Sequence, residues 1–302
     1  MYLLKGRSVG RGTVESVDVL WPPADRRPMF SQTVLAYCAA CFGVHYAADF
    51  FVNVLQPNLF SKAMDRNAFP NRAVAFINAC FIGGVALVHM QPRLLINIGA
   101  GSDEWVGVSA ETLQACGGFE TMNCDCMLGY LVHDTLWYLF IKVGKVEPDL
   151  LVHHGLGLAS WYSVRYTQTG CVWMMWAHMA ELSTPFLHLS WLAVKLNMQK
   201  TWQFWVATRG CLLAFLVFRV VSVGFCTLHM YRHGAEHFQS AWMYGYQVVT
   251  CFLFWCLNLL WFYLLVSMAK TDEIKDAEEK FAGSAIGVGQ SAEPQPTKEK
   301  VR

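Results

Sequence analysis

The stretch from Val152 to Trp191 reads VHHGLGLASWYSVRYTQTGCVWMMWAHMAELSTPFLHLSW. It is apolar enough to be buried in lipid, yet it carries ionisable side chains that include His153, His154, His178, Glu181 and His188. Ionisable side chains are costly at membrane depth, so those that are retained there usually mark a functional site. The stretch therefore predicts two transmembrane helices that carry such a site.

The composition of the whole chain is that of a membrane protein. Of its 302 residues, 55% are hydrophobic and 15% are charged, whereas soluble domains carry about 25% charged residues. A net charge of +1 argues against nucleic acid as a partner. We expect no cleaved signal peptide, because the first residues lack a long apolar core.

Seven apolar segments are expected to cross the membrane, because each approaches the roughly 20 residues that a helical span needs. They lie near Thr33–Leu55, Arg72–Met90, Met122–Val143, Pro148–Tyr166, Cys171–Leu196, Trp202–Val223 and Ala241–Met268. Residues 1–32 are expected to form a polar tail and residues 269–302, which are charged and then rich in Gly, Ser and Pro, a disordered tail. The predicted fold class is all-α and integral to the membrane.

The distribution of Lys and Arg predicts the orientation, because basic loops stay on the cytosolic side. Basic residues flank the first, third and fifth loops, and the second loop is acidic. Seven spans then place the C-terminus in the cytosol, although Arg26 and Arg27 before the first helix favour the opposite orientation. The last five residues, KEKVR, resemble a dilysine retrieval signal, which predicts the endoplasmic-reticulum membrane.

Polar residues of five helices are expected at one depth. At about 1.5 Å of rise per residue they lie roughly 9–15 Å from the cytosolic edge of the membrane. The residues are His45, Asp134, His154, Glu181, Ser183 and Arg209. Such side chains either bond helix to helix, including simple charge pairing, or line a cavity. His153 and His154 point about 100° apart on a helix, so at least one of them should face a cavity.

Pro185 is expected to disturb the helix that carries Glu181. Proline has no N–H to donate to the carbonyl of Glu181, so a kink is expected there, and Ser183 and Thr184 would bond the freed backbone. His178 lies three residues before Glu181 and is expected on the same helix face. The kink would open room beside the carboxylate, although a packing kink without chemistry is the alternative.

The histidines and carboxylates point to acyl chemistry. A neutral histidine acts as a general base or as a nucleophile that carries an acyl group. His154 with Asp134 or Glu181 would supply the imidazole and the carboxylate that orients it, and cytosolic acyl-CoA would be the substrate. We expect no metal and no cofactor, because the sequence has no HxxHH-type box, GxSxG, P-loop or GxGxxG motif.

Three of the eleven cysteines, Cys116, Cys124 and Cys126, lie in or beside one polar loop. They would form a disulfide if the loop faces an oxidising lumen, and free thiols are the alternative. The sequence has no pair of CxxC motifs, which argues against a structural zinc site.

The region from about Arg72 to Met268 resembles the TLC-domain family, which includes the ceramide synthases. The matching features are the pair His153-His154 and, on the next helix, the run AELSTPF from Ala180 to Phe186. This run is similar to the branch of TLC domain-containing protein 4. The resemblance implies a TLC domain over about 72–268, in which six helices form a barrel around a lipid cavity and an extra helix lies at the N-terminal side. It also implies a catalytic histidine pair supported by two acidic positions, one matched by Glu181 and the other by His178 or Thr184.

The sequence departs from the ceramide synthases in two motifs. Their HHxxT motif is replaced by HHGLG, and AHMAELST stands in place of their LHDxSD-like run. We therefore expect a protein of lipid homeostasis that binds a membrane lipid or fatty acyl chain through a polar layer of His45, His178, Ser183, Thr184 and Arg209. The alternative is an acyltransferase whose catalytic residues are Asp134, His153, His154 and Glu181. A transporter is a third class, which the apolar luminal halves of the helices disfavour.

Overall fold

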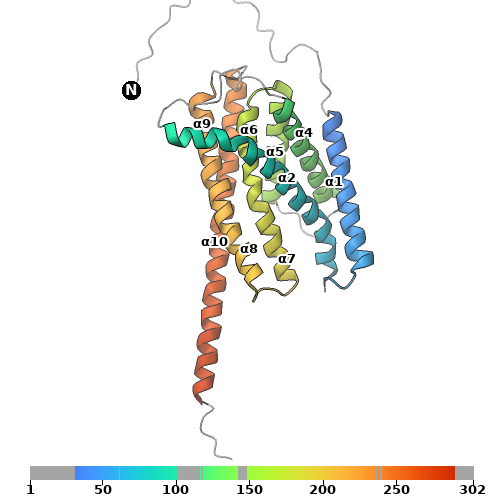
Figure 1. The fold of residues 1–302 in the computed structure, drawn as a ribbon, viewed down its shortest axis with the longest axis vertical. Helices are drawn as coiled ribbons and strands as arrows, with labels where there is room; N and C mark the ends of the chain where they lie inside the picture. The colour runs from blue at the N-terminus through green and yellow to red at the C-terminus, as the bar shows by residue number, and fades with distance from the viewer. Residues whose placement is uncertain are drawn as a thin grey trace, which may run out of the picture.

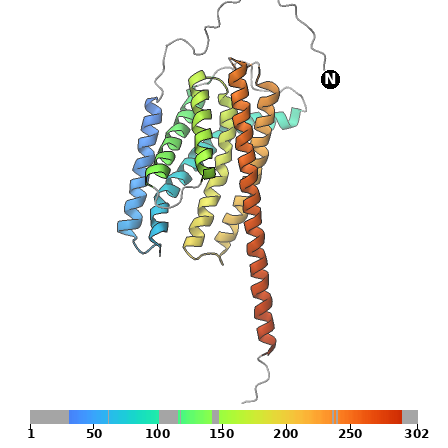
Figure 2. The same ribbon diagram turned by 180° about the vertical axis from the view of Figure 1, so that it is seen from behind.

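The computed structural model describes residues 31–60, 62–100, 116, 118–141, 148–235, 237–238 and 240–289. These residues form seven helical rods and contain no β-strand, which confirms the all-α fold class (Figure 1). Seen from behind, the rods pack into one bundle, and the last helix runs along it and continues beyond one end (Figure 2). Most of the N-terminal tail, the acidic second loop and the dilysine end lie outside the described residues.

Several rods combine two or three helical types. The first rod is α1 (Gln32–Phe50) with the π-helical η1 (Phe51–Leu55), and the second is α2 (Ala63–Ala100). The third is α4 (Gly118–Leu136) with η2 (Trp137–Ile141), and the fourth is α5 (Pro148–Thr167). The fifth is α6 (Cys171–His178), the 3-10 segment η3 (Met179–Ser183) and α7 (Thr184–Lys195). The sixth is α8 (Trp202–Ala214), the π-helical η4 (Phe215–Ser222) and α9 (Val223–His233), and the seventh is α10 (Ala241–Gly289).

Local signals in the sequence account for several helix ends. Pro148 begins α5, where a missing N–H costs no hydrogen bond. The side chain of Thr201 accepts a hydrogen bond from the N–H of Phe204 at 3.4 Å and caps α8. Gly170 adopts φ 81° between α5 and α6, a left-handed conformation that glycine reaches without steric cost.

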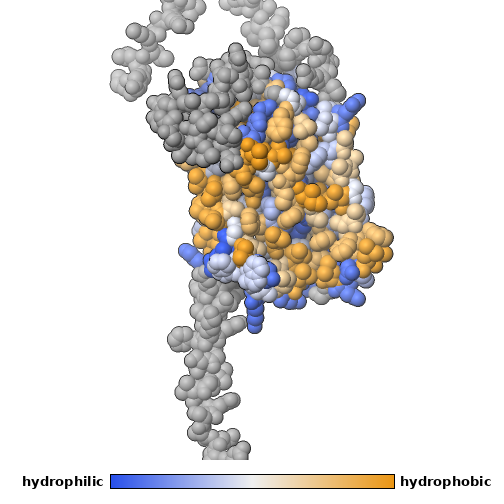
Figure 3. All heavy atoms as spheres, viewed as in Figure 1, coloured by the Kyte–Doolittle hydropathy of each residue, from blue (hydrophilic) through white to orange (hydrophobic). Residues whose placement is uncertain are grey.

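Apolar side chains cover the outside of the bundle. Val88, Phe140 and Leu213 are each more than half exposed. On the face shown in Figure 3, such residues form a band between more polar ends. A continuous apolar surface of this kind is not tolerated in water and marks contact with a membrane.

By length and composition, four segments of the described residues could span a membrane. They are Gln32–Leu55, Asp65–Met90, Trp202–His233 and Ala241–Lys270. The third, fourth and fifth rods, also expected as spans, carry more polar residues. Those of α4 face inward, since Asn123, Asp125 and His133 are buried. The less apolar rods thus supply the polar interior of the bundle.

Some boundaries differ from the expected ones. α2 begins at Ala63 rather than Arg72, so Arg72 lies inside the helix rather than at its edge. The sixth rod continues past Val223 to His233. Thr227 and His229 of this extension are buried within the bundle. The tail expected to be disordered from residue 269 is helical as far as Gly289, since Ala, Glu and Lys, which are frequent in its run AKTDEIKDAEEKFA, are strong helix formers.

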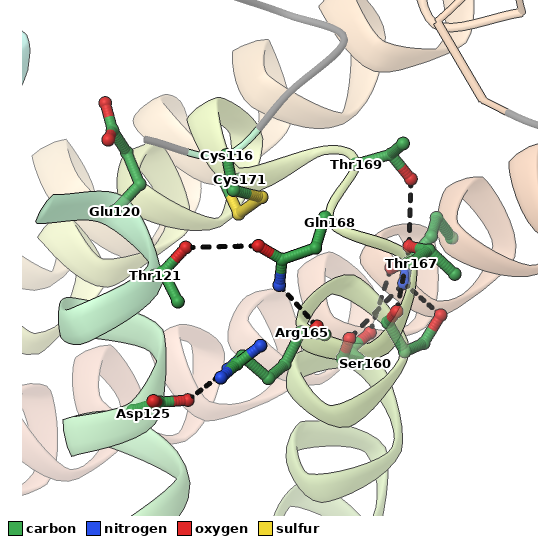
Figure 4. The surroundings of a disulfide bond; sticks show 12 residues. Cys116, Glu120, Thr121, Asp125, Ser160, Arg165, Thr167, Gln168, Thr169 and Cys171 are labelled. Atoms are coloured by element: carbon green, nitrogen blue, oxygen red, sulfur yellow. Dashed lines mark hydrogen bonds and ion pairs between the residues drawn. A yellow bond between two sulfur atoms is a disulfide. The ribbon is translucent and has the colours of Figure 1, made fainter. Parts of the chain in front are cut away.

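A disulfide between Cys116 and Cys171 ties the segment before α4 to the start of α6 (Figure 4). Cys116 therefore pairs with neither Cys124 nor Cys126, which lie inside α4 as free, buried thiols. Below the disulfide, Arg165 Nε donates to Asp125 Oδ1 at 2.5 Å and joins α5 to α4. These links hold one end of the bundle together.

α1 lies against the outside of α4 at a close backbone contact. A Cβ atom added at Gly129 would lie 2.7 Å from the carbonyl oxygen of Val34 and 3.0 Å from the backbone nitrogen of Cys38. Because both neighbours are backbone atoms, the two helices would have to separate to accept any side chain at this position.

Candidate functional site

A cavity of about 440 Å³ lies inside the bundle, within the range of about 300–1,000 Å³ that is typical of small-molecule sites. Its walls come from six of the seven rods, namely α2, α4 with η2, α5, η3 with α7, η4 and α10. None of its described lining residues comes from α1. This arrangement agrees with the expected barrel of six helices with one further helix outside it.

The pair of His154 and Asp134 lies on one wall of the cavity. His154 Nε2 is 2.9 Å from Asp134 Oδ2, and the two side chains are 4% and 8% exposed. Asn71 Nδ2 donates to Asp134 Oδ1 at 2.6 Å, and the hydroxyl of Tyr130 donates to Oδ2 at 3.4 Å. The carboxylate therefore faces several donors from three helices, which holds it in one orientation.

The carboxylate also determines which nitrogen of His154 carries the proton. In a neutral imidazole the nitrogen that bonds a carboxylate is the N–H, so Nδ1 of His154 keeps the lone pair. Nδ1 is buried and has no hydrogen-bond partner among the described residues. A carboxylate on one ring nitrogen and a lone pair on the other is the arrangement of a general base or nucleophile.

A second polar cluster surrounds the buried guanidinium of Arg219 on η4. Its Nε donates to Ser183 Oγ at 2.7 Å, and its Nη2 donates to Thr184 Oγ1 at 2.9 Å. Nη2 also lies 3.5 Å from Glu181 Oε1, and Nη1 donates to Asn258 Oδ1 at 3.4 Å. The buried positive charge is thus matched by a carboxylate, as burial of a charge requires.

The 3-10 segment η3 explains why Glu181 and Thr184 meet one partner. With three residues per turn, side chains three apart lie directly above one another, and Thr184 Oγ1 donates to Glu181 Oε2 at 3.0 Å. The N–H of Thr184 donates to the carbonyl of Glu181, and Pro185 falls in the first turn of α7. The break expected at Pro185 is therefore present, as a tightened segment beside the carboxylate.

His153 lies where the cavity meets a second, narrow pocket of about 40 Å³ and lines both. Its ring packs edge-on against Phe254, with centroids 5.0 Å apart, and lies 5.2 Å from Trp261. Glu181 and Arg219 also line both spaces. These three residues form a polar junction where the wide cavity meets the narrow pocket, beside the apolar side chains of Met127 and Leu131.

The far part of the narrow pocket offers few polar groups that need a partner. Ser160 Oγ donates to Gln247 at 3.3 Å, and Thr227 Oγ1 donates to the carbonyl of Val223 at 2.8 Å. The remaining walls are mostly apolar, including Met174 and Val223. Apolar spaces of this kind stay dry and accept apolar groups, so the narrow pocket, at about 40 Å³, suits the end of a hydrocarbon chain.

Three of the expected residues do not line the cavity. Arg209 lies on α8 and is exposed, whereas Arg219 supplies the guanidinium that was expected from it. His45 is buried on α1, outside the barrel, with its ring centroid 5.6 Å from that of His133. His178 is buried and accepts a hydrogen bond from Trp161 Nε1, so it does not share a partner with Glu181.

Sequence reasoning missed Arg219, Arg72 and Asn71. Arg219 could have been found, because it stands in the apolar run FLVFRVVS, where an unmatched charge is most costly. Arg72 and Asn71 lie on α2. The sequence predicts a span that begins at Arg72, which puts Asn71 in the loop before it. Among the described residues, no group of three or more His, Cys, Asp or Glu side chains is placed to hold a metal ion.

The family model for the TLC domain matches residues 68–267. This range contains nearly every residue that lines the two pockets and excludes α1. Neither the curated proteins nor the solved structures gave a match.

Proposed function

Because the chain belongs to the TLC-domain family, we propose that it binds a membrane lipid or a fatty acyl chain in the cavity between its six helices and serves lipid homeostasis. The observation that carries this proposal is the polar junction between two different spaces. The narrow pocket beyond His153 suits hydrocarbon, whereas the wide cavity offers the donors and acceptors of Asp134, His154 and Arg219. An amphiphile has the same division into an apolar and a polar part.

We place the protein in the endoplasmic-reticulum membrane with its C-terminus in the cytosol. The dilysine-like end supports the location. The disulfide joins the segment before α4 to the start of α6. α4 and α6 begin at the end of the bundle where α1 begins, opposite to the end from which α10 extends (Figure 1). Disulfides persist in oxidising compartments such as the lumen, so this arrangement supports a luminal α1 start. The run AELSTPF supports a relationship to the TLC domain-containing protein 4 branch.

Acyl transfer is a second function, favoured by the contact of His154 with Asp134. An imidazole nitrogen would attack the carbonyl carbon of acyl-CoA, and the carbon–sulfur bond would break as the thiolate leaves. The acyl group would then pass from the imidazole to the amine of a lipid, and the proton that the amine releases as the amide forms would be taken up by the thiolate. Asp134 would stabilise the charged imidazole in both steps.

Two glycines of α5 provide a matched test of lipid binding. A Cβ atom at Gly157, in the narrow pocket, would lie 3.2 Å from Leu131 Cδ1, whereas one at Gly155 would have no neighbour within 4 Å. We expect native mass spectrometry of the purified protein to show a co-purified lipid that Gly157→Leu removes and Gly155→Leu retains. Absence of lipid from the wild type, or equal retention in both folded variants, would contradict the proposal.

A further inference from the structure

Arg72 and His188 form a pair on the wall of the wide cavity that the steps above do not use. Arg72 lies on α2 and His188 on α7, and both line the cavity. The guanidinium carbon of Arg72 lies 4.5 Å from the ring centre of Trp191. Stacking on an aromatic ring holds the guanidinium plane in place, so the positive charge has a fixed position.

The contact between the two side chains determines the tautomer of His188. Arg72 Nη1 lies 3.3 Å from His188 Nδ1, and a guanidinium only donates hydrogen bonds. Nδ1 is therefore the acceptor, and the proton of the neutral ring is on Nε2. Nε2 is buried and has no hydrogen-bond partner among the described residues. This wall consequently has a buried N–H for which an acceptor is missing, beside a fixed positive charge.

Each carboxylate that lines the cavity has a donor of its own. Asp134 bonds His154 and Asn71, and Glu181 faces Arg219. Asp149 Oδ2, nearer the start of α5, accepts a hydrogen bond from Trp261 Nε1 at 2.8 Å. The wall between α2 and α7 contributes the guanidinium of Arg72 and the buried N–H of His188 to the cavity. Arginine binds carboxylate and phosphate oxygens through charge-assisted, often paired hydrogen bonds.

We propose that Arg72 and His188 form an anion-binding site for the head group of the bound lipid. The ligand class is a lipid with a negatively charged oxygen at its head, either the carboxylate of a fatty acid or the phosphate of a lysophospholipid. This inference rests on the proposed function, because it assumes that a lipid enters the cavity. It adds that the lipid is anionic and that its charge meets the wall formed by α2 and α7.

Three single-chain lipids of equal acyl length test the site in full-length protein in detergent. They are palmitate, palmitoyl-lysophosphatidate and the neutral monopalmitoylglycerol, and their affinities are measured by tryptophan-fluorescence titration. We expect at least one anionic lipid to bind about tenfold more tightly than the neutral lipid, as a charge-assisted contact allows. A preference for palmitate assigns the carboxylate, and a preference for lysophosphatidate assigns the phosphate.

The variants separate the charge from the packing of the wall. Arg72→Gln should abolish the preference without weakening the neutral lipid, Arg72→Lys should keep part of it, and His188→Phe should reduce it while keeping a ring in place. His188→Phe leaves the positive charge intact, so it tests the site even if Arg72→Gln does not fold.

Two results would overturn the anion site. Equal affinity for the three lipids, or an equal loss for all three in the variants, would remove the site and leave lipid binding intact. Failure of all three to bind the wild-type protein would remove the proposed function as well.

Discussion

His154 Nε2 and Asp134 Oδ2 lie 2.9 Å apart between α5 and α4, and both side chains are almost fully enclosed by the bundle. The contact crosses two helices that the sequence separates by a loop, and Asn71 of α2 completes it from a third. It therefore links three helices of the barrel and, in the proposed acyl transfer, would prepare one imidazole for chemistry.

Asp134→Asn keeps the shape of the side chain and removes its charge. Because a hydrogen bond to a charged group contributes about 1.5–3 kcal/mol, we expect the free energy of unfolding to fall by that amount. Thermal unfolding followed by tryptophan fluorescence measures the change. Asp49→Asn is the control, since Asp49 bonds an exposed neighbour, Asn53, on the same rod; an equal loss in both variants would contradict the structural role.

His154→Ala tests the chemical role. If the protein transfers acyl groups, wild-type protein incubated with acyl-CoA should gain the mass of an acyl group or form an N-acyl lipid, and this signal should be lost in His154→Ala and His153→Ala. Intact mass spectrometry and lipid extraction provide the readouts. His233→Ala, at the end of α9 and outside both pockets, should retain the signal. Persistence of the signal in a folded His154→Ala protein would exclude His154 from the reaction.

Arg219→Gln and Arg209→Gln compare a buried guanidinium with an exposed one. Removing Arg219 leaves Glu181 buried without its counter-charge, and breaking a buried ion pair costs about 3–5 kcal/mol. An exposed arginine contributes at most about 1 kcal/mol, so Arg209→Gln should change the unfolding temperature little. Similar losses in the two variants would show that Glu181 does not depend on Arg219.

Gly129→Ala should loosen α1, because the new Cβ would lie 2.7 Å from a backbone oxygen of that helix. We expect a lower unfolding temperature but unchanged lipid content, since α1 does not line the cavity. Gly43→Ala on α1 is the control, because a Cβ there has no neighbour within 4 Å. Loss of bound lipid in a folded Gly129→Ala protein would show that α1 takes part in binding.

Cys116→Ser should lower stability through loss of the disulfide with Cys171, by about 2–4 kcal/mol. Cys80→Ser, which removes an exposed free thiol, should have little effect. Mass spectrometry after thiol labelling without reduction should show Cys116 and Cys171 protected in the wild type. Labelling of both would contradict the pairing.

From the sequence, the helices that carry the polar site could be predicted well. The side chains that face the cavity could be predicted less well. His153, His154, Asp134 and Glu181 were identified because charge in an apolar run is costly wherever the helix points. Counting the rise from a helix end gives a depth but not a direction around the axis. The π-helical turn η4 changes that direction within the sixth rod, and Arg219 rather than Arg209 faces the cavity.

Other features needed three-dimensional information. The pairing of Cys116 with Cys171 cannot be deduced from spacing, because the segments before α4 and α6 meet only in the folded bundle. Arg72 stood at the expected edge of a span, where a basic residue ordinarily faces the cytosol. The earlier start of α2 places it inside the bundle, on the cavity wall beside His188.

A density map of the protein, purified without added lipid, tests the central claim most directly. The account predicts elongated density inside the barrel, with its thin end in the narrow pocket beyond His153 and its head between Arg219 and the wall of Arg72. A barrel without such density, with lipid only on the outer surface of the helices, would contradict it.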